Sequence, residues 1–377
     1  MRNKNKVFLK DICSVITKGT TPLQFSDKGI NFIRIENING LNIDTNFDMF
    51  ISEKIHNTDL KRSILQKKDI LFAIAGATVG KCAIVNEKCL PANTNQALAI
   101  IRLKNNYDSF YIANILASEK MKKYIYLNIS VGAQPNLSLE QIGNFQFYVD
   151  DIATQTKIAT FLNLYYKKIE LQKKKIEQLE KLSFDALFAH KYDGKTYKLE
   201  QILTEDNERT TQNNQYEVIS STKAGLYYQK DYFNREIASE DNTGYKILKL
   251  NQVVISPQNL WLGNINYNDK IDIGIVSPSY KIFNINEGLN KTFISHVLKS
   301  KRAIYDYMLS SEQGASVVRR NLNMELFNQI IFTIPGIETQ NYIAHQLILI
   351  NKKLNVEKQK LEVMEKYKRG LLQQLFI

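Results

Sequence analysis

Two segments of the chain carry apolar residues at alternating spacings of four and three, the pattern of a helix that packs along another helix. The first segment covers residues 151–191 and the second covers residues 337–377. Each is long enough to act as a spacer, about 55 Å at 1.5 Å per residue. The expected helix-pairing positions are Ile158, Leu162, Tyr165, Ile169, Gln172, Ile176 and Leu179 in the first segment, and Ile343, Leu347, Ile350, Leu354, Glu357, Leu361 and Met364 in the second.

The polar interruptions of the two seams also match. Gln172 falls on Glu357 when the segments are aligned with an offset of 185 positions. Since polar and apolar positions agree, we expect the two helices to pair with each other. The alternative is that each helix packs on the part of the chain that precedes it.

The stretches before the two helices form a weak internal repeat. The offset of 185 places Gln155 on Gln340, and further upstream the offset shortens to 182 or 183, as changes in loop length would produce. The repeat predicts two modules, residues 1–150 and 195–334, followed by helices at 151–191 and 337–377.

Both modules read as mixed helix and strand. Apolar runs predict strands in the first module, and the second offers matching pieces. The predicted strands are 70–75, 82–85, 97–102 and 145–149, then 252–255, 280–283 and 329–334; helical pieces are predicted at 107–123 and 292–309. The expected fold class is α+β.

Composition narrows the class of protein. The 377 residues, 44% of them hydrophobic, can fill more than one core. A formal charge of +12 favours a polyanionic partner. Cys13, Cys82 and Cys89 form no CxxC pair and read as packing residues in a reducing compartment. With no leader and no apolar run near the roughly 20 residues of a membrane span, we expect a soluble, cytoplasmic protein.

Signatures of catalysis or cofactor binding are missing from the sequence. It holds no Asn-Pro-Pro-aromatic or Asp-Pro-Pro-aromatic tetrapeptide of an amino-methyltransferase. Residues 75–82 imitate a phosphate-binding loop, but three residues separate the glycines instead of four, and Cys82 replaces the magnesium-binding hydroxyl. We interpret this segment as a tight turn. The four histidines are scattered, so no metal site or cofactor is expected.

Loops rich in Arg, Asn, Gln, Ser and Thr are candidates for reading DNA base edges, because these side chains present matching donors and acceptors. In the first module the candidates are Thr17, Lys18, Thr20, Thr21, Arg34, Asn37, Thr78, Lys81, Asn93, Asn95, Gln96, Gln134 and Asn136. In the second they are Ser221, Thr222, Lys223, Gln258, Asn259, Ser279, Arg319, Arg320 and Asn321. Each could instead be a solvated loop residue. The adjacent Arg319 and Arg320 favour a phosphate contact.

Other residues allow two interpretations each. Trp261 could pack in the core or stack on a base. Lys173, Lys174 and Lys175 lie outside the seam and could either contact the DNA backbone or form a solvated face.

Several short motifs, together with the repeated plan of a module followed by a helix, give the chain a resemblance to a known family. The motifs are Gly-Thr-Thr-Pro at 19–22, the stretch 32–38, residues 69–72 leading into 76–80, Asn-Gln-Ala at 95–97, Gln-Pro-Asn-Leu-Ser at 134–138, and the stretch 218–225. In this combination the chain resembles the specificity subunits of Type I restriction-modification systems over essentially its whole length.

The resemblance implies a function divided among subunits. It implies two target recognition domains that each read half of a bipartite site in double-stranded DNA. An antiparallel helix pair would hold them apart and dock two DNA adenine methyltransferase subunits, with Phe161, Leu171, Phe184, Leu187 and Phe188 as candidate docking residues. Methylation from S-adenosylmethionine would belong to those subunits, and cleavage to a motor-nuclease subunit where one joins. This chain would carry no catalysis.

Three other functions stay open. The same architecture could serve a Type IIB-like or orphan methylation complex. A stand-alone DNA-binding regulator would bind its site without a partner. A nuclease or methyltransferase in its own right would need motifs that the sequence lacks.

Overall fold

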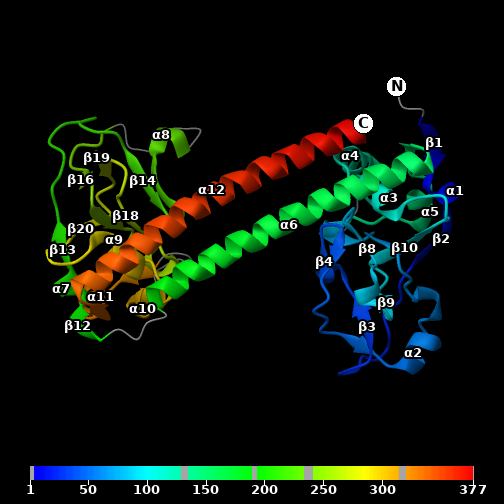
Figure 1. The fold of residues 1–377 in the computed structure, drawn as a ribbon, viewed down its shortest axis with the longest axis horizontal. Helices are drawn as coiled ribbons and strands as arrows, with labels where there is room; N and C mark the ends of the chain where they lie inside the picture. The colour runs from blue at the N-terminus through cyan, green and yellow to red at the C-terminus, as the bar shows by residue number, and fades with distance from the viewer. Residues whose placement is uncertain (1–3, 129–134, 189–192, 233–240, 314–319, 377) are drawn as a thin grey trace. The chain divides into compact units, whose positions relative to one another are not determined.

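The computed structural model describes residues 4–128, 135–188, 193–232, 241–313 and 320–376 (Figure 1). The chain divides into two compact units, one formed by Met1–Lys174 with Gln359–Ile377 and the other by Lys175–Lys358. Each unit contains a mixed α/β module and a part of both long helices. The predicted α+β class is confirmed.

A four-stranded antiparallel sheet forms the centre of unit 1, with the strand order β2-β10-β7-β8. Its strands are β2 (Cys13–Lys18), β10 (Leu98–Leu103), β7 (Ile70–Ala73) and β8 (Cys82–Ile84). Three of the predicted strands, 70–75, 82–85 and 97–102, are confirmed as β7, β8 and β10. These runs are continuously apolar rather than alternating because both faces of the sheet are covered.

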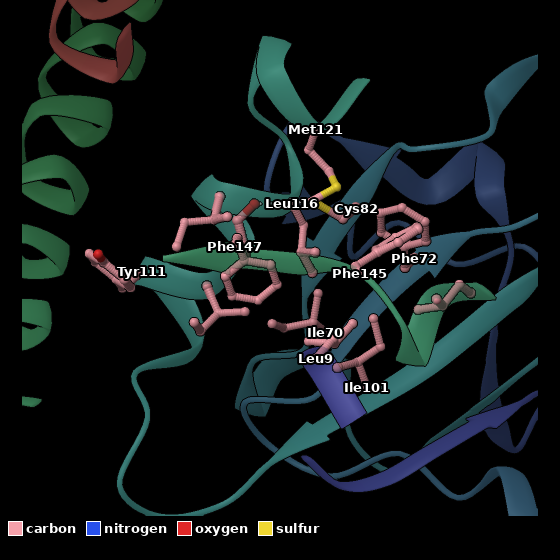
Figure 2. Packing of buried hydrophobic residues seen from close by; sticks show 14 of the residues in the cluster. Leu9, Ile70, Phe72, Cys82, Ile101, Tyr111, Leu116, Met121, Phe145 and Phe147 are labelled. Atoms are coloured by element: carbon pink, nitrogen blue, oxygen red, sulfur yellow. Dashed lines mark hydrogen bonds between the residues drawn. The ribbon is translucent and has the colours of Figure 1, made fainter. Parts of the chain in front are cut away.

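The two faces of this sheet belong to different cores. Ile70 and Phe72 face a core shared with α3 (Ser109–Leu116), α4 (Glu119–Asn128) and the long helices, as Figure 2 shows. Leu71 and Ala73 face a second core, which includes residues from β9 (Ala92–Thr94) and from the end of β3 (Ile30–Ile33). The sheet therefore separates a helical layer from a layer of short strands.

The remaining elements of unit 1 are short and surround this sheet. Strand β1 pairs with β11, and β3 lies between β6 and β9 in a three-stranded sheet. Their bounds are β1 (Asn5–Phe8), β11 (Gln146–Val149), β6 (Phe50–Ile51), β4 (Ile38–Asn39), β5 (Asn42–Ile43), α1 (Leu9–Ile12), α2 (Glu53–Asn57), α5 (Leu139–Gly143) and the 3-10 turns η1 (Ile35–Asn37), η2 (Lys61–Ser63), η3 (Gly76–Thr78) and η4 (Glu87–Cys89). The predicted strand at 145–149 is confirmed as β11.

Unit 2 repeats the plan of unit 1. Its central sheet has the corresponding strand order β13-β20-β17-β18, and β12 pairs with β23 as β1 does with β11. The bounds are β12 (Gly194–Lys198), α7 (Leu199–Ile202), β13 (Leu203–Asp206), β14 (Ile219–Thr222), β15 (Gly225–Tyr228), α8 (Gln229–Tyr232), β16 (Lys246–Lys249), β17 (Gln252–Ile255), η5 (Leu260–Leu262), β18 (Ile265–Tyr267), β19 (Ile273–Val276), β20 (Lys281–Ile285), α9 (Lys291–Leu298), α10 (Lys301–Leu309), β21 (Ser311–Gln313), β22 (Arg320–Leu322), α11 (Met324–Asn328) and β23 (Ile331–Pro335).

The helical pieces expected at 107–123 and 292–309 are each two helices. In unit 1 the break follows α3, and the hydroxyl of Ser118 accepts a hydrogen bond from the backbone N–H of Met121. In unit 2 the break follows α9, and the hydroxyl of Ser300 accepts one from Ala303. A serine at an N-cap position starts a new helix, and the hydrophobic pattern does not reveal this.

The long helices are α6 (Ile152–Phe188) and α12 (Ile337–Leu375), and they pack antiparallel in each unit (Figure 1). In unit 1 the hydroxyl of Tyr165 donates to the Met364 carbonyl at 3.0 Å, and Lys173 pairs with Glu365 at 2.9 Å. In unit 2 Lys175 pairs with the buried Glu357 at 2.6 Å. The contact between Tyr165, in the first half of α6, and Met364, in the second half of α12, is the one expected of antiparallel helices.

The first turns of the two long helices pack on their own modules. Ile158 and Leu162 belong to the core of unit 1, and Ile343 and Leu347 belong to the core of unit 2. The same two cores also contain residues of the other long helix, Leu375 in unit 1 and Leu187 in unit 2. These four residues therefore pack on a module without excluding helix pairing, because a heptad stripe does not specify which surface covers it.

The cysteines are buried packing residues. Burial raises the pKa of the Cys13 and Cys82 thiols to about 12 and raises that of Cys89 as well. All three thiols are therefore protonated near neutral pH and fill core volume.

Candidate nucleic-acid interface

The candidate residues of the first module come from separate loops that the sheet brings to one end. The end of β2 pairs with the start of β10, because Lys18 lies opposite Ala99. The start of β10 also pairs with the end of β7, and β7 ends where β8 begins. Loops that follow β2 and β7 therefore lie beside the loop that precedes β10. These are the loops that carry Thr20, Thr21, Asn95, Gln96, Thr78 and Lys81.

Close backbone packing joins two of these loops. Gly19 donates to the Leu98 carbonyl at 3.1 Å, and Thr20 donates to the Thr94 carbonyl at 3.0 Å. A side chain at Gly19 would meet the Thr94 carbonyl, so only glycine fits there. The Thr21 hydroxyl donates to the amide oxygen of Gln96, and both residues are exposed. Lys18 is exposed and Thr17 is partly exposed on the same strand.

Arg34 reaches the same end through a different sheet. Strands β3 and β9 run parallel, and Ile33 lies opposite Thr94, so Arg34 and Asn95 both follow the ends of neighbouring strands. The Arg34 guanidinium donates from one nitrogen to both carboxylate oxygens of Asp48 at 3.0 Å. This ion pair partly neutralises the arginine.

Two of the residues predicted to contact DNA are buried instead, so the prediction is wrong for them. Asn93 is fully buried, and its amide bonds to His56, to the Leu60 carbonyl and to the Ser63 hydroxyl. Asn37 is 7% exposed and accepts the backbone N–H of Arg34. Both amides serve the fold, because a buried amide must find its partners inside the protein.

The segment that imitates a phosphate loop is a tight turn, as expected. The 3-10 turn η3 lies within it, and Gly80 has a φ of +91°. Thr78 is partly exposed, and Lys81 and Asn136 are exposed. Ala75 forms a backbone β-bridge with Asn136, which places that residue beside the turn. Gln134 lies outside the described residues.

The second module brings its candidates to the corresponding end of its sheet. Ile255 at the end of β17 lies opposite Lys281 at the start of β20 and Ile265 at the start of β18. Gln258 and Asn259 follow β17, and Ser279 precedes β20. Arg320 joins them, because its backbone N–H donates to the Gln258 carbonyl at 3.2 Å.

The other candidates of this module differ in accessibility. Ser221 is buried, donates to Asn264 and accepts from Asn266, so the prediction of a DNA contact there is corrected. The Thr222 hydroxyl is occupied by the hairpin turn. Lys223 is exposed in that turn and Asn321 is exposed on β22, whereas Arg319 lies outside the described residues.

Sequence reasoning missed two features of these surfaces. Arg62 donates to the Thr20 hydroxyl at 3.3 Å, which adds an exposed cation to the end of the first module. The guanidinium carbon of Arg320 lies 4.5 Å from the centroid of the Trp261 ring. Neither contact has a local sequence signal, because each joins loops far apart in the chain.

The lysines of residues 173–175 have separate roles. Lys173 and Lys175 are bound to Glu365 and Glu357 of α12. Lys174 is exposed, and no described carboxylate lies within ion-pair distance of it. For Lys174 both interpretations stay open, a contact with the DNA backbone or a solvated face.

The described ranges of the chain contain no cluster of three or more His, Cys, Asp or Glu side chains that could hold a metal ion. None of the helices in those ranges combines the length and apolarity of a membrane span.

Fold and surface together define a protein with two copies of one loop-bearing frame and a pair of long helices. Residues 1–181 match the model of a protein family described as the Type I restriction modification DNA specificity domain. The resemblance found in the sequence is therefore confirmed, with the family match covering this part of the chain.

Solved structures of low sequence identity share the fold over the whole chain. The S subunit of a Type I restriction-modification system from M. genitalium is 14% identical, with a TM-score of 0.59 over 100% of this chain and 96% of that chain. A structure described by complex assembly and conformational transition of the Type I R-M system is 11% identical, with a TM-score of 0.54 over 98% of this chain and 97% of that chain.

Proposed function

We propose that this chain is the DNA-recognition subunit of a Type I restriction-modification complex and that each module reads one half of a bipartite site. The observation that carries the proposal is the gathering of polar and cationic loop residues at the same end of the corresponding sheet in both modules. The frame repeats, but its side chains differ, with Thr20 and Gln96 in one module and Gln258 and Arg320 in the other. Two different half-sites require such a difference.

The charge of the chain supports binding to DNA. A net charge of +12 provides the cations that replace condensed counterions on phosphates. Exposed Lys18, Arg62 and Lys81 lie in or next to the segments that carry the gathered residues of the first module.

A second apolar stripe on the long helices is the proposed docking surface for methyltransferase subunits. Leu164 and Leu171 of α6 are 62% and 66% exposed, and Leu349 and Val356 of α12 are 49% and 57% exposed. The pairs are related by the same offset of 185 that relates the modules. Matching exposed stripes, one pair in each unit, fit two copies of one partner.

The other docking candidates divide by accessibility. Phe161 and Phe184 are about half exposed and can contribute to docking. Leu187 is buried in the core of unit 2, so it cannot contribute to the proposed docking surface. The side chain of Phe188 lies outside the described residues.

The test is to co-express the chain with the DNA adenine methyltransferase encoded beside it and to sequence the host DNA with modification-sensitive reads. We expect a bipartite methylated motif with a fixed gap that disappears when this chain is omitted. Absence of methylation, together with tight site-specific binding by the chain alone, would favour a regulator. An orphan or Type IIB-like complex would give the same kind of motif and is distinguished by the subunits encoded beside this chain.

Exchange of one module is the more specific version of this experiment. Replacing residues 1–150 with the corresponding module of a related chain should alter one half-site and leave the other half-site unchanged. A change in both half-sites would contradict the assignment of one module to each.

A further inference from the structure

Arg320 of the second module combines an ordered guanidinium with an unneutralised charge. Its guanidinium carbon lies 4.5 Å from the centroid of the Trp261 ring, within the range of a cation–π contact. Its backbone N–H is bound to the Gln258 carbonyl, which fixes the start of β22 beside the loop after β17. Among the described residues, no carboxylate lies within ion-pair distance of this arginine.

Arg102 and Arg34 are instead held by carboxylates. Asp69 binds Arg102 through two bonds of 2.7 Å, and Asp48 binds Arg34. A carboxylate occupies the N–H edge of the guanidinium, which is the part that would bind a base. An aromatic ring occupies the face and leaves the edge available. The contact with Trp261 therefore orients Arg320 without occupying its donors.

Trp261 is placed as a platform in a loop rather than as a hydrogen-bonded core residue. It lies in η5, directly after Gln258 and Asn259, and is partly exposed. Its indole N–H is buried and has no hydrogen-bond partner among the described residues. A buried tryptophan usually finds such a partner. The polar atom of Trp261 therefore does not anchor the ring, whereas its face contacts Arg320.

The first module has different residues at the corresponding positions. The offset of 183 that aligns Gly80 with Gly263 places Trp261 on Thr78, and the offset of 185 places Arg320 on Pro135. The pair is therefore specific to one module. A residue that distinguishes two half-sites should be specific in this way.

We infer that Arg320 reads a guanine in the half-site of the second module and that Trp261 is the positioning residue that holds it; this inference rests on the proposed function. Guanine presents O6 and N7 as adjacent acceptors in the major groove, and a fixed planar guanidinium donates to both. This assignment differs from the phosphate contact that the adjacent Arg319 and Arg320 suggest. A phosphate contact would need the positive charge of Arg320 but not the fixed planar orientation of its guanidinium.

The experiment compares Arg320→Lys and Arg320→Gln with the unaltered chain in the complete complex with the methyltransferase, and the readout is the methylated motif. Both variants should lose preference for guanine by about 10- to 100-fold at one position of one half-site, with the other half-site and the gap unchanged. Trp261→Ala should weaken preference at that same position, and Trp261→Phe should weaken it less. Arg302→Lys, on the exposed face of α10, is the matched control and should leave the motif unchanged.

The possible outcomes separate this inference from the proposed function. If Arg320→Lys retains the motif and Arg320→Gln reduces methylation equally at all sites, Arg320 contacts phosphate and the inference is overturned. An unchanged motif and unchanged methylation level in both variants would overturn it as well. If the unaltered chain directs no methylation, the proposed function fails and the inference fails with it.

Discussion

Gln155 and Gln340 are structural counterparts that make the same two hydrogen bonds in their own modules. The Gln155 side chain accepts the backbone N–H of Asp108 at 3.0 Å and donates to the Asp150 carbonyl at 2.8 Å. The Gln340 side chain accepts the N–H of Asn290 and donates to the Pro335 carbonyl, both at 2.8 Å. In each module one buried amide therefore joins the start of the long helix to the N-terminus of α3 or α9.

Replacing either glutamine with alanine should destabilise the module that contains it. Gln155→Ala leaves a partly buried N–H and a buried carbonyl without partners, and each such group costs about 1–3 kcal/mol. We expect a loss of about 2–4 kcal/mol in the free energy of unfolding, measured by urea denaturation. Gln178→Ala, an exposed position on the same helix, is the control. Equal effects of Gln155→Ala and Gln178→Ala would contradict the proposed role of the buried amide.

A second hydrogen bond between helices also repeats, but its chemistry differs between the modules. In unit 1 the hydroxyl of Tyr166 donates to the amide oxygen of Asn114 at 2.6 Å. In unit 2 His296 and Asn351 take the corresponding positions, 2.8 Å apart. The other ring nitrogen of His296 donates to the Thr292 carbonyl, so Nε2 accepts from Asn351. Burial raises the pKa of Tyr166 further above neutral, so in this contact only the imidazole of unit 2 can change its protonation between pH 5 and 8.

Unit 2 should lose stability as the pH falls below about 6.5. Burial holds the pKa of His296 below its usual value, despite the hydrogen bond to Thr292. The unfolded chain then binds a proton at a higher pH than the folded chain, so acid favours unfolding. His296→Asn should reduce this dependence when thermal midpoints are compared between pH 5 and 8. His345→Asn, exposed on α12, should preserve it. Parallel pH profiles for His296→Asn and the unaltered chain would rule out the histidine as the cause.

Charge reversal within residues 173–175 should separate pairing of the helices from DNA binding. The buried Glu357 pairs with Lys175 at 2.6 Å and with Lys353 at 3.4 Å. Lys175→Glu removes the shorter of these two ion pairs and should lower the free energy of unfolding by about 1–3 kcal/mol. Lys174→Glu should change stability by less than about 0.5 kcal/mol. It should weaken DNA affinity in filter binding without changing the methylated motif. A changed motif would instead make Lys174 a base-reading residue.

Local patterns were sufficient to predict three of the four strands of the central sheet in unit 1, two of the four in unit 2, and the long helices. The apolar run at Ile70–Ala73 and the heptad seams are properties of consecutive residues, so they can be recognised without knowledge of the fold. The parallel pair β3 and β9 could not be recognised in this way, because its partners are about 60 positions apart. The breaks at Ser118 and Ser300 depend on capping rather than on hydrophobicity.

The candidate interface could be predicted only as a set of residue types. Asn93 and Asn95 have the same side chain and lie two positions apart, yet β9 buries Asn93 and the following turn leaves Asn95 partly exposed. Which loops meet depends on the strand order, which brings Thr21 to Gln96 and Arg320 to Trp261. The spacing of these residues in the sequence does not indicate that they are in contact. Only the structure shows that the loops gather at one end of each sheet.

The exposed stripes should each bind one methyltransferase subunit. The pair Leu164→Glu with Leu171→Glu removes the apolar surface of α6, and Leu349→Glu with Val356→Glu removes that of α12. Each double variant should reduce the assembled complex from two methyltransferase copies to one, as read from its mass in native mass spectrometry.

Asn163→Glu, exposed on α6, is the control for the added charge and should keep both copies. If each double variant retains both copies, the stripe is not the docking surface.

Lengthening the long helices should lengthen the gap between the two half-sites, because we propose that the helix pair sets the distance between the modules. Four residues added to both α6 and α12 extend each helix by about 6 Å, or roughly two base pairs at 3.4 Å per pair. The gap should therefore grow by about one or two base pairs in the methylated motif, while both half-sites stay the same. Substituting four exposed residues without adding length is the control, since it changes composition but not distance. An unchanged gap with both half-sites still read would show that something other than the helices sets the spacing.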